Sequence, residues 1–330
     1  MKLSKIGLSL ALCAAFSAQA ADPKLAIVYD SGGKFDKSFN QSASEGAERF
    51  KKETKIAYQE VQVNNDAQTE QALRNLARKN VDLIAAIGFA QAQAVQTVAK
   101  EFPKTKFVLI DGVANGDNIS SVLFKEQEGS YLVGVAAAMA SKSKKLGFVG
   151  GMDIPLIRAF GCGYAQGAKA IDGKIEVTQN MVGTTPAAWN DPAKGSELAL
   201  AQFERGVDVV FAAAGGSGMG SLQAAKTKGK LAIGVDSNQN YLHPGVMLTS
   251  MLKRVDNAIY DSFMQVKKGN WQAGIVNKGL KEGGVDWALD SHNRALITPE
   301  MEKRINAAKQ DIVSGKVKVV DYRASNSCPV

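Results

Sequence analysis

The feature that most limits the fold of this chain is a regular alternation of short apolar runs and helical patterns along most of its length. The apolar runs are rich in β-branched residues and too short for helices, as in strands that are buried on both faces. Predicted strands occupy residues 25–29, 56–63, 83–88, 106–111, 121–124, 146–151, 177–182, 207–214, 231–236 and 247–252. Predicted helices occupy residues 38–52, 69–79, 91–101, 126–141, 158–171, 192–205, 219–228 and 255–268. This alternation predicts an α/β fold with parallel sheets covered by helices on both faces.

The alternation falls into two sets, at residues 25–125 and 144–252, which predict two doubly wound lobes. Removing an export signal of 20 residues from 330 leaves 310, more than a single core usually holds. The segment of about 254–282 is expected to return to the first lobe, and the segment from about 283 to the second. The predicted domains are a signal at 1–20, an N-terminal lobe at 21–125 plus about 254–282, and a C-terminal lobe at 126–253 plus about 283–330.

The first twenty residues have the three parts of an export signal. Lys2 and Lys5 precede an apolar stretch from Ile6 to Phe16, and Ala18-Gln19-Ala20 forms an A-x-A cleavage site. We therefore expect cleavage before Ala21 and a soluble, monomeric protein in the periplasm. A lipoprotein signal is the less favoured alternative, because Cys13 follows Leu12 instead of a small residue.

The charge distribution argues against nucleic acid as a partner. The net charge is +8, but lysines and arginines are dispersed and no aromatic residues alternate with them, so solvated helix faces explain them better. His243 and His292 lie far apart without the spacing of metal ligands, so neither a metal nor a cofactor is expected.

Two cysteines, Cys162 and Cys328, remain in the exported chain. An even pair in an oxidising compartment could form a bridge from the C-terminal tail to the second lobe. Two unpaired thiols are the alternative, and from the sequence we favour them slightly.

Several predicted strands end in an aspartate, namely Asp30, Asp111, Asp153 and Asp236. Such residues are often helix caps, but ligands of open α/β sheets bind at the carboxyl ends of strands. A carboxylate accepts short, charge-assisted hydrogen bonds from the hydroxyl groups of a sugar. In the loop after the first strand, Asp36 or Ser38 is expected to cap the next helix.

The same loop contains the run DKSFNQSASEG at residues 36–46, which resembles the signature of the basic membrane protein family. These are the purine-nucleoside-binding substrate-binding proteins of ABC transporters. The resemblance continues in order through IGFAQAQAV, FVLIDG, FKEQEGSYLVGVAAAMASKS, GFVGGMDIPLIRAFGCGYAQGAK, AAWNDPAKG, GVDVVFAAAGG, AIGVDSNQ and TSMLKRVDNAIY. It implies the type I periplasmic-binding-protein fold, in which three crossovers join the two lobes. It further implies a non-enzymatic component of an ABC importer, with permease and ATPase partners and a guanosine-, inosine- or adenosine-type ligand.

The resemblance also implies roles for individual residues. Phe39 and Phe160 match the positions where the family holds the purine between aromatic rings, although a Phe at a helix start is more often core on composition alone. Asp236 and Lys253 match positions that bind ribose hydroxyls, and Gly215 matches a close backbone approach to the sugar. Four further candidates near the base, the sugar rim or the wall are Asp30, Asn40, Asp111 and Phe89. Trp189 precedes a predicted Asn190-Asp191-Pro192 helix start, and we expect it to serve packing.

Three alternatives remain at this stage. Within binding proteins, the ligand could be a sugar, an autoinducer or another small polar molecule. The second alternative is a dehydrogenase, an enzyme with a nucleotide cofactor. A dinucleotide fingerprint is approximated by the run Gly216-Ser217-Gly218-Met219-Gly220-Ser221 with Asp236 at the next strand end, but Ser221 replaces the third glycine. A nucleoside hydrolase-like enzyme is not supported either, and no His stands beside a candidate nucleophile.

Overall fold

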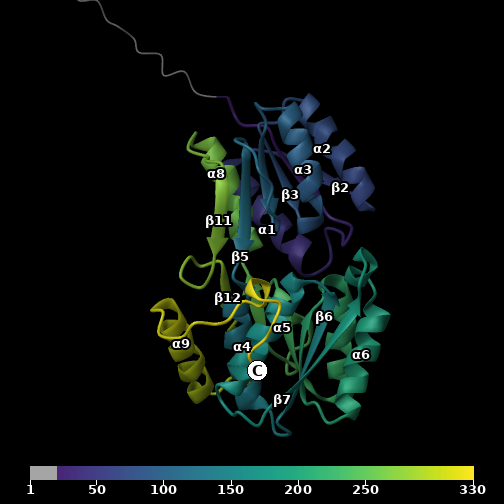
Figure 1. Cartoon of the computed structure of the whole chain (residues 1–330), viewed down its shortest axis with the longest axis vertical. Coiled ribbons are helices and arrows are strands. Elements are labelled where there is room, and N and C mark those ends of the chain that lie inside the picture. The colour runs from purple at the N-terminus through teal and green to yellow at the C-terminus, as the bar shows by residue number, and fades with distance from the viewer. Residues whose placement is uncertain (1–20) are drawn as a thin grey trace, which may run out of the picture.

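The computed structural model describes residues 21–330 and divides them between two lobes, each built on a six-stranded sheet (Figure 1). The export signal predicted at residues 1–20 lies outside the described residues. In the first lobe the strand order is β11-β5-β4-β3-β1-β2, and all pairs are parallel. These strands are β1 (Leu25–Tyr29), β2 (Tyr58–Gln62), β3 (Leu83–Ile87), β4 (Lys106–Ile110), β5 (Ile119–Phe124) and β11 (Gly274–Lys278).

Helices cover both faces of the first sheet, as the apolar runs predict. The helices are α1 (Phe39–Thr54), α2 (Thr69–Arg78), α3 (Ala92–Glu101) and α8 (Val255–Lys267). In β1, Leu25, Ile27 and Tyr29 belong to the same core cluster as residues of α1 and α8. Ala26 and Val28 belong to a separate cluster with residues of α2 and α3. Both faces of the strand are therefore buried, which explains its unbroken apolar sequence.

The second lobe repeats the arrangement with the order β12-β10-β9-β8-β6-β7, in which only β12 runs antiparallel to its neighbour. Its strands are β6 (Lys145–Met152), β7 (Glu176–Gly183), β8 (Val209–Ala213), β9 (Leu231–Asp236), β10 (Met247–Lys253) and β12 (Val285–Trp287). Its helices are α4 (Glu126–Ala140), α5 (Pro155–Lys169), α6 (Pro192–Glu204), α7 (Gly218–Lys228) and α9 (Pro299–Val313). Short 3₁₀ turns lie at Asp66–Gln68, Phe89–Gln91, Pro186–Trp189, Gly215–Ser217, Asn240–Leu242 and Tyr322–Ala324 (η6).

The predicted strands and helices are all present, with ends shifted by a few residues. The start of α5 moves from Arg158 to Pro155, because a proline is well suited to the first helical turn. β11, β12 and α9 were not predicted from the sequence. β11 is mostly exposed and so lacks a buried apolar run, and β12 has only three residues, too few to show a pattern.

The chain passes between the lobes three times, as the fold class predicts. It leaves the first lobe between β5 and α4, returns between β10 and α8, and leaves again between β11 and β12. We propose that the lobe boundaries lie in these segments, close to residues 125, 253 and 282.

The C-terminal tail is tied to the second lobe by a disulfide bond between Cys328 and Cys162 of α5. The slight preference for two unpaired thiols was therefore wrong. The two residues are 166 positions apart, and sequence spacing alone does not show that the tail returns to α5.

No helix within residues 21–330 is both long and apolar enough to cross a membrane.

Candidate functional site

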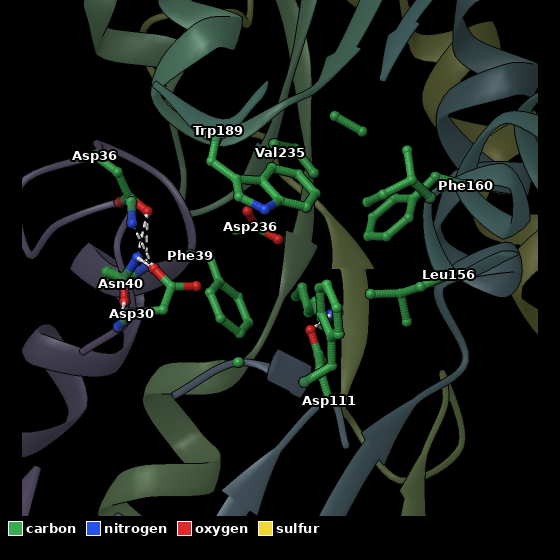
Figure 2. Close-up of a pocket in the computed structure, with 17 residues that line it drawn as sticks. Asp30, Asp36, Phe39, Asn40, Asp111, Leu156, Phe160, Trp189, Val235 and Asp236 are labelled. Atoms are coloured by element: carbon green, nitrogen blue, oxygen red, sulfur yellow. Dashed lines mark hydrogen bonds and ion pairs between the residues drawn. The ribbon is translucent and has the colours of Figure 1, made fainter. Parts of the chain in front are cut away.

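The carboxyl ends of the strands in both lobes meet at a cavity, which Figure 2 shows. The structure places all of the sequence-predicted site residues in its lining: Asp30, Phe39, Asn40, Phe89, Asp111, Phe160, Gly215, Asp236 and Lys253. Asp153 is not among the lining residues, and its carboxylate pairs instead with Arg158 of α5 at 2.6 Å. Of the four predicted strand-end aspartates, Asp30, Asp111 and Asp236 therefore line the cavity, whereas Asp153 forms an ion pair with the first turn of α5.

The loop after β1 is fixed by Asp36, whose carboxylate caps α1. It accepts hydrogen bonds from the backbone N–H groups of Ser38, Asn40 and Gln41 at 2.8, 2.9 and 3.1 Å. Ser38 stands at the cap position without a capping bond of its own, so Asp36 is the predicted cap that performs the task. Burial raises the pKa of Asp36 to about 6, against the lowering effect of these backbone hydrogen bonds.

Asn40 connects this cap to the end of β1. Its amide nitrogen donates to Asp30 Oδ1 at 2.8 Å and to Asp36 Oδ2 at 3.1 Å. Both amide hydrogens are therefore used within the protein. In this conformation Asn40 orients Asp30, and its amide group has no hydrogen left to donate to a ligand.

A buried group of charges forms the floor of the cavity around Lys253, at the end of β10. Its ammonium lies 2.5 Å from Asp111 Oδ2 and 3.0 Å from Glu126 Oε1, and its side chain is only 2% exposed. Asp111 and Lys253 belong to different lobes, so this ion pair crosses the cleft. Within residues 21–330, Asp111 Oδ1 is buried without a hydrogen-bond partner. One carboxylate oxygen at the cavity is thus available to a donor from a ligand.

The electrostatics of this group follow from burial and from the competition of three carboxylates for Lys253. Burial raises the pKa of Asp111 to about 6 and that of Asp236 to about 6, while Lys253 counteracts both shifts. Burial by itself lowers the pKa of Lys253, but Asp111, Glu126 and Asp236 together hold it above its ordinary value. The lysine is therefore a permanent cation, and the aspartates change charge near pH 6.

Asp111 and Asp236 occupy corresponding places in the two lobes. Asp111 directly follows β4, and Asp236 is the last residue of β9. Each of these strands is third in the strand order of its sheet. Both have left-handed backbones, with φ of 67° and 63°. This conformation is unfavourable for residues other than glycine, and such residues cluster at functional sites.

Aromatic side chains form the walls. Phe39 and Phe160 lie on opposite sides of the cavity, one from each lobe (Figure 2). The Lys253 ammonium lies 5.3 Å from the ring centre of Phe39 and 5.6 Å from that of Phe160, within cation–π range. The two rings are thus arranged around one cation, with the open part of the cavity between them.

Trp189 packs against the hydrophobic core, as the sequence predicts, and it also lines the cavity. Its indole lies against Gly151, where an added Cβ would be 2.2 Å from Cζ3 of the ring. Gly215 has φ of 55°, and a Cβ there would lie 3.4 Å from the Trp189 carbonyl oxygen. Gly151 therefore leaves room for the indole beside the cavity. The pair Gly150-Gly151 near the end of β6 is the sequence signal for such a close approach.

Direct hydrogen bonds hold the lobes together at the mouth of the cleft. The Ser38 hydroxyl donates a short hydrogen bond to Asp236 Oδ2, and the Ser237 hydroxyl donates to the Ser38 carbonyl oxygen at 2.8 Å. Gln239 Nε2 donates to the Lys37 carbonyl oxygen at 2.8 Å. The structure is therefore a closed form, and Asp236 serves both the cavity and the contact between the lobes.

The glycine-rich run after β8 does not form a dinucleotide-binding turn. A Cβ on Gly220 would lie 1.7 Å from the Pro192 carbonyl oxygen, and the Ser221 hydroxyl donates to the Gly195 carbonyl oxygen at 2.8 Å. The run thus packs α7 closely against α6, and its small residues are explained by that contact.

Comparisons with known proteins agree with this geometry. Residues 24–322 match the family described as ABC transporter substrate-binding protein PnrA-like. The chain is 36% identical over 321 residues to the ABC transporter nucleoside-binding protein BmpA of Lactococcus lactis subsp. cremoris, covering 90% of this chain and 89% of that protein. It is 32% identical over 313 residues to basic membrane protein A of Borreliella burgdorferi, covering 92% and 89%.

Among solved structures, the chain is similar to an ABC transporter solute-binding protein from Aeropyrum pernix K1, with a TM-score of 0.83 and 29% identity over 91% of this chain and 94% of that one. The predicted type I periplasmic-binding-protein fold and the predicted absence of enzymatic activity are confirmed. Proteins of this class work outside the cytoplasm, in the periplasm or extracellular space, together with a permease. This chain belongs to the PnrA-like (basic membrane protein) family of ABC transporter substrate-binding proteins.

Proposed function

We propose that the protein captures a purine nucleoside of the guanosine, inosine or adenosine type in the interlobe cavity and delivers it to an ABC importer. The observation that carries this proposal is the combination of two aromatic rings on opposite sides of the cavity, Phe39 and Phe160, with a buried set of charges beside them. A free sugar needs the charges but not a slot between two rings. A nucleobase joined to ribose needs both.

In this arrangement the base lies between Phe39 and Phe160, and Asp236 and Lys253 bind the ribose hydroxyls. Asp111 Oδ1 accepts a further donor, and Asp30 lies at the rim with Phe89 and Trp189 as walls. Gly215 permits the close approach of the sugar to the backbone. The lobes close over the ligand about the three connecting segments, as in hinge-type binding proteins.

Native mass spectrometry of the protein, purified without unfolding, tests the ligand class. We expect a fraction of the molecules to retain a mass that corresponds to a purine nucleoside. A retained pentose, hexose or autoinducer mass would instead support the alternative of a different small polar ligand.

We also propose a monomeric periplasmic protein whose mature chain begins at Ala21. The A-x-A site at Ala18-Gln19-Ala20 supports this cleavage position. The intact mass of the exported protein should equal that of residues 21–330. A lipid adduct on Cys13 would show that the lipoprotein alternative is right.

Replacing Phe39 with alanine should weaken all purine nucleosides by a similar factor of about 10–100, because each base–aromatic stack is worth ~1–3 kcal/mol and tolerates any base. Calorimetric titration of guanosine, inosine and adenosine measures the three factors. A matched control is Phe35→Ala, since the Phe35 side chain is 75% exposed and is not part of the cavity lining. Unequal factors that single out one base would show that Phe39 contributes recognition other than stacking.

Nucleoside affinity should fall when the pH is lowered from 7 to 5. Burial raises the pKa values of Asp111 and Asp236 to about 6, and only their ionised forms accept hydrogen bonds from ribose hydroxyls on both oxygens. The pKa values of these two aspartates also depend on the charged and polar groups that face them, which are Lys253, Ser38, Asp36 and Glu126. The ionised fraction of one group with this pKa falls from about 0.9 to about 0.1 over that range, so with two such carboxylates we expect guanosine to bind about 10–100-fold more weakly. Equal or tighter binding at pH 5 would contradict the use of these carboxylates as acceptors.

A further inference from the structure

Glu126 connects the cavity to the C-terminal tail. It is the first residue of α4, directly after the first passage between the lobes, and it is completely buried. One carboxylate oxygen lies 3.0 Å from the Lys253 ammonium, and the other lies 3.0 Å from the Arg323 guanidinium. Within the described chain, neither oxygen has an aligned hydrogen-bond donor. The charge of Glu126 is therefore balanced by two cations, one in the cavity and one in the tail.

Arg323 is held in the turn η6 by contacts to the tail itself and to the end of β5. Its guanidinium pairs with Asp321 at 2.9 Å and donates to the Phe124 carbonyl oxygen at 3.1 Å. Although burial by itself lowers the pKa of Arg323, Glu126 and Asp321 hold it above its ordinary value. The guanidinium is thus a fixed positive charge behind the cavity.

The tail that contains Arg323 is fastened to α5, the helix that supplies Phe160. The Gln166 side chain exchanges two hydrogen bonds of 2.9 Å with the backbone of Val320. Eight residues further on, Cys328 is bonded to Cys162 of the same helix. Fastening the tail on both sides of η6 fixes the place of Arg323 against Glu126.

Among residues 21–330, removing the charge of Arg323 would leave Lys253 as the one cation paired with Glu126. Charges that are shielded from water interact strongly and are screened little by salt. The ammonium would then be drawn toward Glu126 and away from Asp111, which lies on the opposite lobe. The Lys253 ammonium would then no longer be placed to bind a ribose hydroxyl, while the aromatic walls of the cavity would be unchanged.

We propose that Arg323 is a positioning residue for Lys253, acting through Glu126, and that the Cys162–Cys328 disulfide keeps it in place, so that the C-terminal tail sets the affinity for the sugar part of the ligand. This inference rests on the proposed function, because its measure is the affinity for a nucleoside. The tail would thus influence ligand binding although none of its residues lines the cavity.

The first test compares guanosine with guanine by calorimetry. Arg323→Gln should weaken guanosine about 10-fold, in the range of one lost hydrogen bond to a charged group, and should leave guanine unchanged. Arg323→Lys should recover part of the loss. Adding Glu126→Gln to Arg323→Gln should also recover affinity, because it removes the carboxylate that competes for Lys253. A purely structural role of Arg323 would weaken both ligands and would not be compensated by Glu126→Gln.

Arg294→Gln is the matched control. Arg294 pairs with Glu302 at 2.8 Å in the same lobe but on the exposed surface, and its loss should leave both affinities unchanged.

The second test addresses the disulfide through Cys328→Ser, which frees the tail without altering the buried Cys162. Guanosine should bind about 10-fold more weakly, and the double variant with Arg323→Gln should be no weaker than Arg323→Gln alone. Independent, multiplying losses would overturn the link between the disulfide and Arg323. If wild type binds guanosine and all these variants bind it equally well, the inference fails alone. If wild type binds no nucleoside, the proposed function fails and the inference falls with it.

Discussion

Replacing Lys253 with methionine should abolish measurable nucleoside binding and lower the free energy of unfolding at pH 7 by about 3–5 kcal/mol. Lys253 is 1% exposed and faces Asp111 and Glu126 at 2.5 and 3.0 Å. Removing one partner of a buried ion pair leaves uncompensated charge in a region that water does not reach. The flexible side chain of methionine is similar in length, so the change removes charge with little change in volume.

The loss of stability should depend on pH in a defined direction. The pKa of Asp111 and that of Asp236 are already raised to about 6 by burial, with Lys253 opposing the rise. Without the lysine they rise further, so both groups bind protons in the folded protein at a pH where the unfolded chain does not. Because protonation removes the uncompensated charge, the stability deficit relative to wild type should shrink from pH 7 to pH 5.

Urea unfolding of both proteins at the two pH values measures this change. Lys309→Met is the matched control, since Lys309 pairs with Asp286 at 2.6 Å in a partly exposed position and should contribute about 1 kcal/mol or less. A Lys253→Met protein as stable as wild type at pH 7 would show that the carboxylates are neutralised by other means.

Replacing Asp236 with alanine should weaken the binding of a nucleoside much more than the binding of its free base. The carboxylate has two tasks, as an acceptor for ribose hydroxyls in the proposed complex and as the acceptor of the Ser38 hydroxyl across the cleft. Guanosine loses both and should bind about 100-fold more weakly, since each hydrogen bond to a charged group is worth ~1.5–3 kcal/mol. Guanine has no ribose and should lose only the smaller part that closure contributes, about 10-fold or less.

Two control variants divide these contributions. Ser38→Ala removes the contact between the lobes but leaves the carboxylate, so it should weaken guanosine and guanine by the same modest factor. Asp153→Ala removes the strand-end aspartate that pairs with Arg158 outside the cavity lining, and it should change neither affinity. If Asp236→Ala harms guanine as much as guanosine, Asp236 contacts the base or supports closure alone, and the assignment of the ribose pocket is wrong.

The sequence predicted the parts of the site that local patterns encode. A strand that is buried on both faces has an unbroken apolar run, so its end, and the aspartate that follows it, can be located without a structure. Parallel strands bring such ends to one edge of a sheet, which is why Asp30, Asp111 and Asp236 could be grouped at one cleft. The choice of Phe39 and Phe160 as facing rings came from the family resemblance, because helix-start aromatics alone are more often core.

The remaining parts depend on contacts between distant segments. Glu126 appears in the sequence as an ordinary acidic residue at a helix start, where it would suit the helix dipole. Its role beside Lys253 arises because β5 and β10 end together at the passages between the lobes. Arg323 reaches Glu126 only because the tail returns along α5, and neither this path nor the disulfide has a local sequence pattern. That Trp189 also lines the cavity could not be predicted, because its position depends on the space that Gly151 of β6 leaves.

Calorimetric titration of the wild-type protein, emptied of retained ligand, with guanosine, guanine and ribose tests the central claim most directly. The account predicts that guanosine binds most tightly, that guanine binds more weakly because it lacks the contacts to Asp236 and Lys253, and that ribose alone binds weakest because it cannot use the rings of Phe39 and Phe160. Tight binding of ribose or another free sugar, with no heat from any purine nucleoside, would contradict it.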